Sequence, residues 1–354
     1  MKIIKILAML FIIGVTLAAL GAAGFALWVG HAYEKPGPLD KSASLIISPG
    51  DNIAARLQSV GAIDNLFIFK LSARFSGAES RLKAGEYEIP AHASIKEILD
   101  LLESGKVILR QITIPEGLTN WQVEQILQGD QNLQQAESLP DYAEGTLLPE
   151  TYSYQQGENA ADILQRMERA MQQSLLTGCG IMLEAKGNKT LSDLLDMDCP
   201  NAPPPLKTLK DVLILASIIE KETGKAEERK TIAGVFINRL RKEIALQSDP
   251  TVIYALTGGK PKNDGKGPLG RRLLKKDLEA DSPYNTYKYP GLPPGPIANP
   301  GSAAIEAALH PEQNDYLYFV ADGSGGHVFA KTLREHTENV GRWRQIRRQQ
   351  ADAK

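Results

Sequence analysis

The sequence predicts an α+β protein carried on a single N-terminal transmembrane helix. Three observations support this fold class. Residues 6–29 contain neither a charge nor a proline. Short strand-like runs alternate with helical periodicity from residue 45 onward, and helix-capping residues precede several of the periodic segments. The 354 residues, 43% hydrophobic and 23% charged, are enough for a membrane anchor and roughly two extramembrane domains.

The N-terminal segment is long enough to cross a membrane. At about 1.5 Å per residue, residues 6–29 exceed the ~30 Å hydrocarbon thickness of a bilayer. Lys2 and Lys5 precede this segment, so the positive-inside rule places the N-terminus in the cytoplasm and the remaining chain outside. A cleaved signal peptide is the alternative, although its apolar core is only about 7–15 residues. A buried core helix does not fit a segment this close to the chain start. We predict a cytoplasmic tail at 1–5, an anchor at 6–29 and a polar, proline-bearing linker at 30–44.

Residues 45–107 predict a small α+β module. Two short strands are expected at 45–48 and 83–89, and Ile53, Leu57 and Val60 recur at helical spacing between them. Ser94 and Glu97 form a capping box that opens a helix over 95–104, which Gly105 ends.

Residues 108–354 predict a larger mixed domain. It is expected to begin with a strand over 107–114 and a helix capped by Thr119, followed by a polar helical region at 125–200 with a turn at 145–152. Three further helices are expected: one around 209–223, an amphipathic one around 232–240, and a short one through Leu256 with Asp249 as N-cap. A strand over 317–321 and a hairpin turn at 322–327 follow.

Helix periodicity singles out Glu222. At about 100° per residue, Glu222 falls within a few tens of degrees of Leu215 and Ile219, whereas Glu220 points away from that stripe. A carboxyl in apolar surroundings has a raised pKa and can donate a proton near neutral pH. The alternative is a structural glutamate that pairs with Lys221 or Lys225.

The proline- and glycine-rich segment 281–301 is long for a loop inside a compact domain, and such loops are often functional. Its Tyr284, Asn285 and Tyr287 suit sugar rings and acetamido groups. A surface loop whose tyrosines merely pack is the alternative.

Charge and cysteine content exclude some classes of function. A net charge of −2 leaves no electrostatic footprint for nucleic acid. The five histidines are scattered and neither cysteine has a CxxC partner, so we expect no metal site. If the chain is exported, Cys179 and Cys199 could form a disulfide.

Six motifs in register resemble a known family over essentially the whole chain. They are Ile218–Thr223 (IIEKET), Val235–Leu240 (VFINRL), Leu246–Tyr254 (LQSDPTVIY), Tyr284–Tyr287 (YNTY), Gly291–Gly295 (GLPPG) and Tyr316–Gly323 (YLYFVADG). Together with the anchor they resemble the endolytic murein transglycosylases, the YceG-like family of the MltG type.

This resemblance implies a membrane-anchored lytic transglycosylase that cleaves peptidoglycan strands internally and needs no metal or organic cofactor. It implies that 45–107 is a LysM-like, glycan-contacting module and that 108–354 is the catalytic domain. The expected location is the bacterial inner membrane with the catalytic domain periplasmic, and peptidoglycan synthases are candidate partners.

The resemblance also implies site residues. Glu222, followed by a hydroxyl residue, is the expected catalytic acid. Gln247 and Asn285 are candidates to hold acetamido or hydroxyl groups, Tyr284 and Tyr287 to stack on sugars, and Ser248 or Thr223 to orient the carboxyl. Two rival functions remain: a hydrolytic muramidase that uses Glu222 with Asp249, and a non-catalytic wall-binding scaffold on the membrane.

Overall fold

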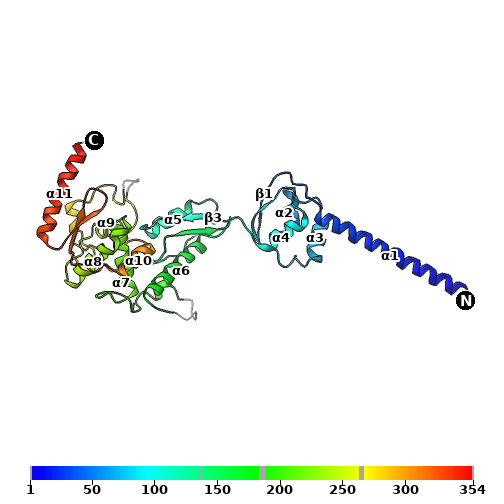
Figure 1. Cartoon of the computed structure of the whole chain (residues 1–354), viewed down its shortest axis with the longest axis horizontal. Helices are drawn as coiled ribbons and strands as arrows, with labels where there is room; N and C mark the ends of the chain where they lie inside the picture. Colours follow the sequence, from blue (N-terminus) through cyan, green and yellow to red (C-terminus); the bar gives the residue numbers. More distant parts are fainter. Residues whose placement is uncertain (1, 136–137, 183–188, 263–266, 353–354) are drawn as a thin grey trace. The chain divides into compact units, whose positions relative to one another are not determined.

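The computed structural model describes residues 2–135, 138–182, 189–262 and 267–352 (Figure 1). Met1, which begins the predicted cytoplasmic tail 1–5, lies outside the described residues. The chain divides into two compact units. The first comprises residues 1–110 with 153–157, and the second comprises 111–152 with 158–354. The architecture is mixed α+β, as expected.

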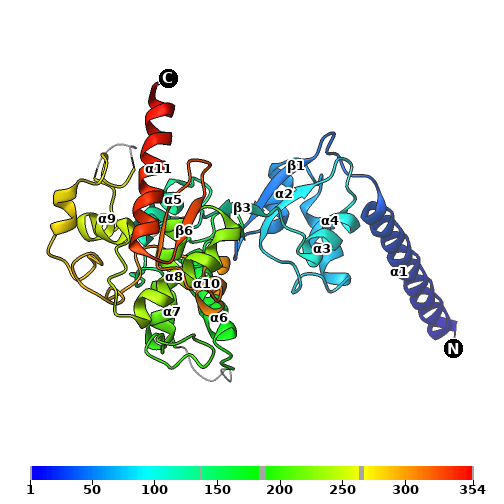
Figure 2. The same cartoon turned by 60° about the vertical axis from the view of Figure 1, so that its left-hand side comes forward.

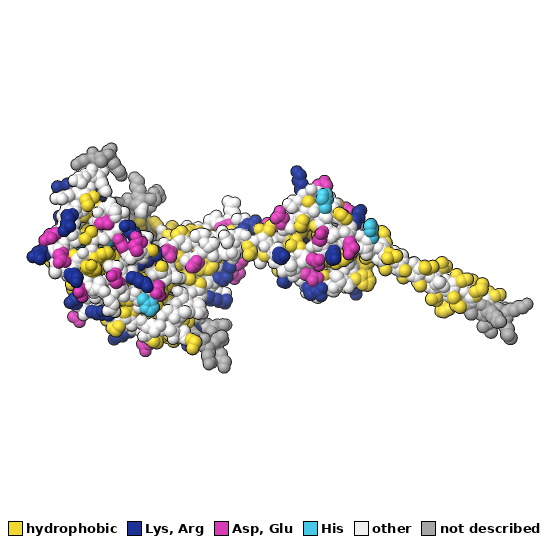
Figure 3. All heavy atoms as spheres, in the orientation of Figure 1, with side chains coloured by type: hydrophobic (Ala, Val, Ile, Leu, Met, Phe, Trp, Pro, Cys, Tyr) yellow, Lys and Arg dark blue, Asp and Glu magenta, His cyan; other side chains and the backbone are white. Residues whose placement is uncertain are grey.

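The first unit begins with one long apolar helix, α1 (Lys2–Glu34). Hydrophobic side chains cover its surface in Figure 3. Within the described part of the chain, its stretch Met9–Glu34 is the one helical segment long and apolar enough to span a membrane. The helix therefore extends into the predicted linker, through residue 34. Tyr33 and Leu39 then pack against the core of the first unit, so this linker is partly anchored.

The rest of the first unit surrounds a two-stranded antiparallel sheet in which Leu45 is paired with Tyr87. Its elements are β1 (Ala43–Ile47), α2 (Ile53–Ser59), α3 (Leu66–Phe75), β2 (Gly85–Ile89) and α4 (Ile95–Ser104). The capping box of Ser94 and Glu97 is present, and Gly105 ends α4 in the left-handed conformation. Leu57, Tyr87 and Ile98 are fully buried at the centre of this core.

A second two-stranded sheet pairs β3 (Arg110–Thr113) with β4 (Thr151–Tyr154). The sequence indicated only a turn at 145–152, and it was wrong for the end of that segment. Tyr152 and Tyr154 alternate with less buried residues, as in a strand with one buried face. The preceding glycine and proline obscured this short pattern.

The second unit is mainly helical and is built around α7 (Leu209–Glu222). Its other elements are α5 (Asn120–Gly129), α6 (Ala160–Gly178), η1 (Leu191–Asp193), η2 (Ala226–Glu228), α8 (Arg229–Arg241), α9 (Asp249–Thr257), η3 (Lys275–Glu279), α10 (Ser302–Leu309), β5 (Tyr318–Ala321), β6 (His327–Ala330) and α11 (Leu333–Asp352). The hairpin β5–β6 is antiparallel, as expected, and α11 packs beside it (Figure 2).

Helix α7 is enclosed on all sides. Every residue from Val212 to Ile219 is buried, because α6, α8, α9 and α10 all pack against the helix. The sequence pattern suggested a single apolar stripe. This expectation was wrong, since a central helix has no solvent face.

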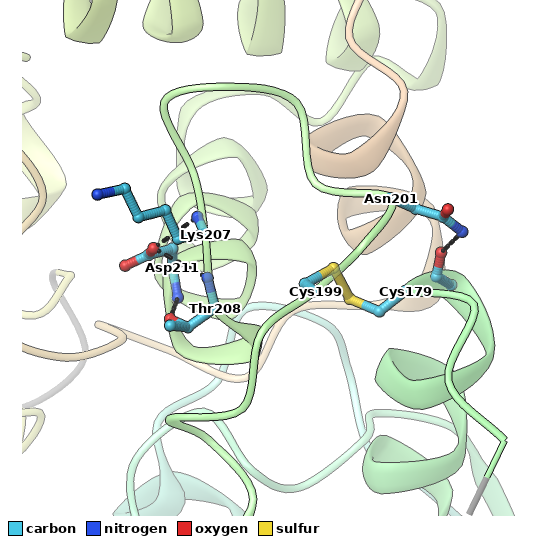
Figure 4. The surroundings of a disulfide bond; sticks show 7 residues. Cys179, Cys199, Asn201, Lys207, Thr208 and Asp211 are labelled. Atoms are coloured by element: carbon cyan, nitrogen blue, oxygen red, sulfur yellow. Dashed lines mark hydrogen bonds between the residues drawn. A yellow bond between two sulfur atoms is a disulfide. The ribbon is translucent and has the colours of Figure 1, made fainter.

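Cys179 and Cys199 form a disulfide, which the sequence left open. Their disulfide joins the end of α6 to the segment that leads into α7 (Figure 4). Asn201 supports the same junction, because its Nδ2 donates to the Gly178 carbonyl at 3.0 Å. Closing a loop of this size contributes about 3 kcal/mol in the chain-entropy model. The disulfide therefore helps to fix the central helix.

Candidate active site

A cavity of about 480 Å³ lies at the C-terminal end of α7. Its polar lining consists of Glu222, Arg239, Gln247, Asp249, Tyr287, Tyr318 and His336. Leu246, Phe319, Val320, Leu333 and Val340 supply the apolar lining. A second cavity, of about 550 Å³ between α1 and α3, is lined mainly by apolar residues and contains no carboxylate, histidine or cation. Of these two cavities, the one at the end of α7 is the one that brings acidic and basic side chains together.

Glu222 is the last residue of α7 and reaches this cavity. Its Oε1 accepts a hydrogen bond from Ser248 Oγ at 2.5 Å. Desolvation by burial raises its pKa to about 7; the Ser248 hydrogen bond opposes this shift and the nearby charge of Asp249 adds to it. No described lysine or arginine forms an ion pair with Glu222, and Lys221 Nζ donates to the Gly117 carbonyl instead. Glu222 can therefore hold a proton near neutral pH.

Glu220 provides an internal comparison two residues earlier. Its side chain is only 6% exposed, and desolvation also raises its pKa. However, its carboxylate lies 3.7 Å from Arg229 and accepts a hydrogen bond from the Gly301 N–H at 3.1 Å. Desolvation thus raises the pKa of both glutamates. The difference is that Glu220 faces a cation and Glu222 faces the cavity.

Ser248 is the N-cap residue of α9, although its hydroxyl makes no capping hydrogen bond. That hydroxyl donates to Glu222 instead. The sequence predicted Asp249 as the N-cap, which was wrong by one position. Asp249 is the first helical residue, lines the cavity and accepts a hydrogen bond from the Tyr287 hydroxyl at 2.6 Å. The turn before α9 thus places the Ser248 hydroxyl against Glu222 and the Asp249 carboxylate in the wall of the cavity.

Gln247 and Tyr287 also line the cavity. Gln247 has a left-handed backbone with φ of 52°, and its Oε1 accepts from Arg239 Nη2 at 2.7 Å. Its backbone N–H is bound by the Thr286 carbonyl at 3.1 Å. These contacts fix the turn that presents Ser248.

The other three candidate residues lie away from the cavity. Asn285 is fully buried; its Nδ2 donates to the carbonyls of Leu278 and Ala280, and its Oδ1 accepts from the Tyr287 N–H. The Tyr284 ring packs 4.9 Å from that of Tyr254. The Thr223 hydroxyl is bonded to the Lys225 N–H and to Glu228, and makes no hydrogen bond to Glu222 among the described residues. Asn285 therefore positions Tyr287, and its polar atoms are already occupied.

Sequence reasoning missed Arg239, Tyr318 and His336. Arg239 could have been found, because it follows Ile232 by seven residues and so lies on the apolar face of α8. Tyr318 and His336 come from β5 and α11, whose packing gives no local signal. In the described part of the chain, no three side chains of the metal-binding types are grouped together.

Comparisons with known proteins indicate which family the chain resembles. A model of the YceG-like family matches residues 47–342. A Bacillus subtilis protein named endolytic murein transglycosylase is 34% identical over 317 residues, covering 81% of this chain and 79% of that protein. A Streptococcus pneumoniae protein of the same name is 30% identical and covers 92% of this chain, which spans 63% of that protein. The crystal structure of a YceG-like protein from Listeria monocytogenes covers 84% of this chain and 98% of its own, with 30% identity and a TM-score of 0.45.

Proposed function

Because the chain belongs to the YceG-like family, we propose that it is a membrane-anchored endolytic murein transglycosylase that cleaves nascent peptidoglycan strands and so ends their elongation. The observation that carries this proposal is the state of Glu222. It is a carboxyl with a pKa of about 7, without a cationic partner among the described residues, beside a cavity of about 480 Å³. This is the state that a general acid requires at neutral pH.

In the proposed reaction, protonated Glu222 donates its proton to the oxygen that links N-acetylmuramic acid to N-acetylglucosamine. The C1–O bond breaks, and the 2-acetamido group of the substrate stabilises the positive centre at C1. The Glu222 carboxylate then takes the proton of the muramoyl 6-hydroxyl, whose oxygen bonds to C1. Intramolecular closure has a high effective molarity, so the protein mainly has to position the sugar. Ser248 holds one carboxyl oxygen and leaves the other for the substrate.

The proposal extends to the domains and the membrane. We assign a cytoplasmic tail to 1–5, a transmembrane anchor to 6–29, a linker to 30–44, a LysM-like module to 45–107 and the catalytic domain to 108–354. The order β1–α2–α3–β2 with antiparallel strands supports the LysM-like assignment. The domains beyond the anchor lie on the periplasmic side, where peptidoglycan synthases are the expected partners.

Product analysis tests this function directly. Uncrosslinked glycan strands digested with the full-length protein should yield fragments that end in 1,6-anhydro-N-acetylmuramic acid, each 18 Da lighter than the hydrolytic product, by the mass of one water. Mass spectrometry reads this difference. Reducing ends would mean that water is the acceptor, and the hydrolytic muramidase would replace this proposal. Binding without any cleavage would favour the scaffold.

The pH profile should follow the protonation of Glu222. Since the acid form is required, kcat/KM should decline as pH rises through about 7, approaching a tenfold loss per pH unit. Asp249→Asn removes a like charge that helps to raise this pKa, so the decline should begin at lower pH. A profile of Asp249→Asn that matches the parental one would contradict this coupling. Complete loss of activity in Asp249→Asn would favour the hydrolytic mechanism.

A further inference from the structure

Arg239 carries a buried charge that the proposed mechanism does not use. The residue is 6% exposed and lines the cavity beside Glu222. Among the described residues, its guanidinium makes one hydrogen bond, from Nη2 to Gln247 Oε1 at 2.7 Å. Its Nε is buried without a hydrogen-bond partner, and no described carboxylate forms an ion pair with the guanidinium within 4.0 Å. A buried cation without an anionic partner is costly, so its presence in the cavity needs a reason.

The part of the cavity wall that contacts the Arg239 guanidinium is aromatic. The guanidinium lies over the Tyr318 ring, 5.4 Å from its centroid, which offers a cation–π contact. His336 stacks on the same ring at 5.1 Å. Burial and the charge of Arg239 lower the pKa of His336, and its Nδ1 also lacks a partner in the described structure. This side of the cavity therefore carries one positive charge, while the unpaired Arg239 Nε and His336 Nδ1 atoms themselves lie buried.

The hydrogen bond from Arg239 to Gln247 does not explain why residue 239 carries a charge. Gln247 needs one hydrogen-bond donor to hold its left-handed backbone, and a neutral side chain could provide it. The two carboxylates of the cavity do not compensate Arg239 either, because neither Glu222 nor Asp249 forms an ion pair with a described residue. The positive charge of the Arg239 guanidinium therefore remains without a partner. A guanidinium is planar and permanently charged, and it binds carboxylates through two parallel hydrogen bonds.

We propose that Arg239 binds a carboxylate carried by the N-acetylmuramic acid residue of the glycan strand and thereby selects the strands that are cut. This inference rests on the proposed function and deepens it by naming a specificity-determining residue. The carboxylate has two sources. In strands without stem peptides it is the lactyl group, and in strands with stem peptides it belongs to the peptide. The acetylated glucosamine has no carboxylate, so Arg239 also fixes which sugar occupies the site next to Glu222.

The test uses the full-length protein in detergent and three strand preparations. The first is freed of peptides and bears lactyl carboxylates, the second is the same material with these groups converted to neutral methylamides, and the third retains its stem peptides. We expect the parental protein to cleave at least one carboxylate-bearing preparation about 10- to 100-fold faster than the methylamide, in kcat/KM. A preference for the first preparation identifies the lactyl source, and a preference for the third identifies the peptide.

Arg239→Gln should remove this preference and cleave all three preparations at rates close to that of the methylamide. Arg239→Lys keeps the charge without the fork and should retain part of the preference. Arg342→Gln, an exposed arginine on α11, is the matched control and should behave like the parental protein. Thermal unfolding of each variant shows whether the fold is kept. A preference that survives in Arg239→Gln, or an equal loss on all three preparations, would overturn the inference.

Binding separates this inference from the proposed function. In a Glu222→Gln background, which is not expected to cleave, affinity for the same preparations should show the preference, and the added Arg239→Gln change should abolish it. If the parental protein cleaves nothing, the proposed function fails. The binding measurement still decides whether Arg239 binds a carboxylate. Equal affinity with and without Arg239 would overturn the inference whatever the activity.

Discussion

Glu222→Gln is expected to reduce strand cleavage by about 10²- to 10⁴-fold, the range that a positioned general acid contributes. Glutamine has almost the same shape, and its amide oxygen can still accept the hydrogen bond from Ser248. It has no acidic proton to give to the glycosidic oxygen, nor can it take one from the 6-hydroxyl. The fold should be kept, since a neutral amide replaces a carboxyl that is already desolvated. Release of soluble fragments from purified strands measures the loss.

Glu220→Gln is the matched control, because it lies on the same helix and is also buried. Its change weakens a contact with Arg229, which retains Glu116 at 3.2 Å. We therefore expect a small loss of stability and cleavage close to the parental rate. Parental cleavage by Glu222→Gln would make catalysis by Glu222 untenable. Abolition of activity by Glu220→Gln would move the acid to that position.

Helix periodicity singled out Glu222 as the candidate acid, and the structure places this residue at the cavity. The periodicity argument was nevertheless incomplete. The rotation of about 100° per residue correctly predicted that Glu220 and Glu222 point in different directions from α7. The side of the helix that carries Glu220 is also covered, by α10 and the segment around Gly301. A sequence gives the angle of a side chain around its helix and does not give what packs at that angle. The decisive difference, a cation at one glutamate and a cavity at the other, is tertiary.

The same limit explains the other site residues. Ser248, Gln247 and Asp249 were recognisable because they are adjacent in one motif before α9. Asn285 was chosen for its amide, yet that amide is fully used by neighbouring backbone groups of Leu278, Ala280 and Tyr287. His336 enters the cavity only because α11 packs on the β5–β6 hairpin. Local capping signals, by contrast, placed α4 at its observed bounds.

Asn299→Ala is expected to destabilise the second unit by about 3 kcal/mol, since buried polar groups left unpaired cost about 1–3 kcal/mol each. Asn299 is fully buried. Its Oδ1 accepts from the Leu147 N–H at 2.9 Å, and its Nδ2 donates to Leu118 O and to Asn120 Oδ1. Alanine would orphan the Leu147 N–H and the Asn120 oxygen, while the backbone hydrogen bonds of residue 299 to Leu118 and Gly117 would remain. Thermal unfolding should show a midpoint lower by about 2–4 °C per kcal/mol. The exposed Asn201→Ala should shift it far less, because it breaks one surface contact. An unchanged midpoint for Asn299→Ala would contradict this cost, and would mean that the backbone hydrogen bonds of residue 299 are enough to hold the end of the loop.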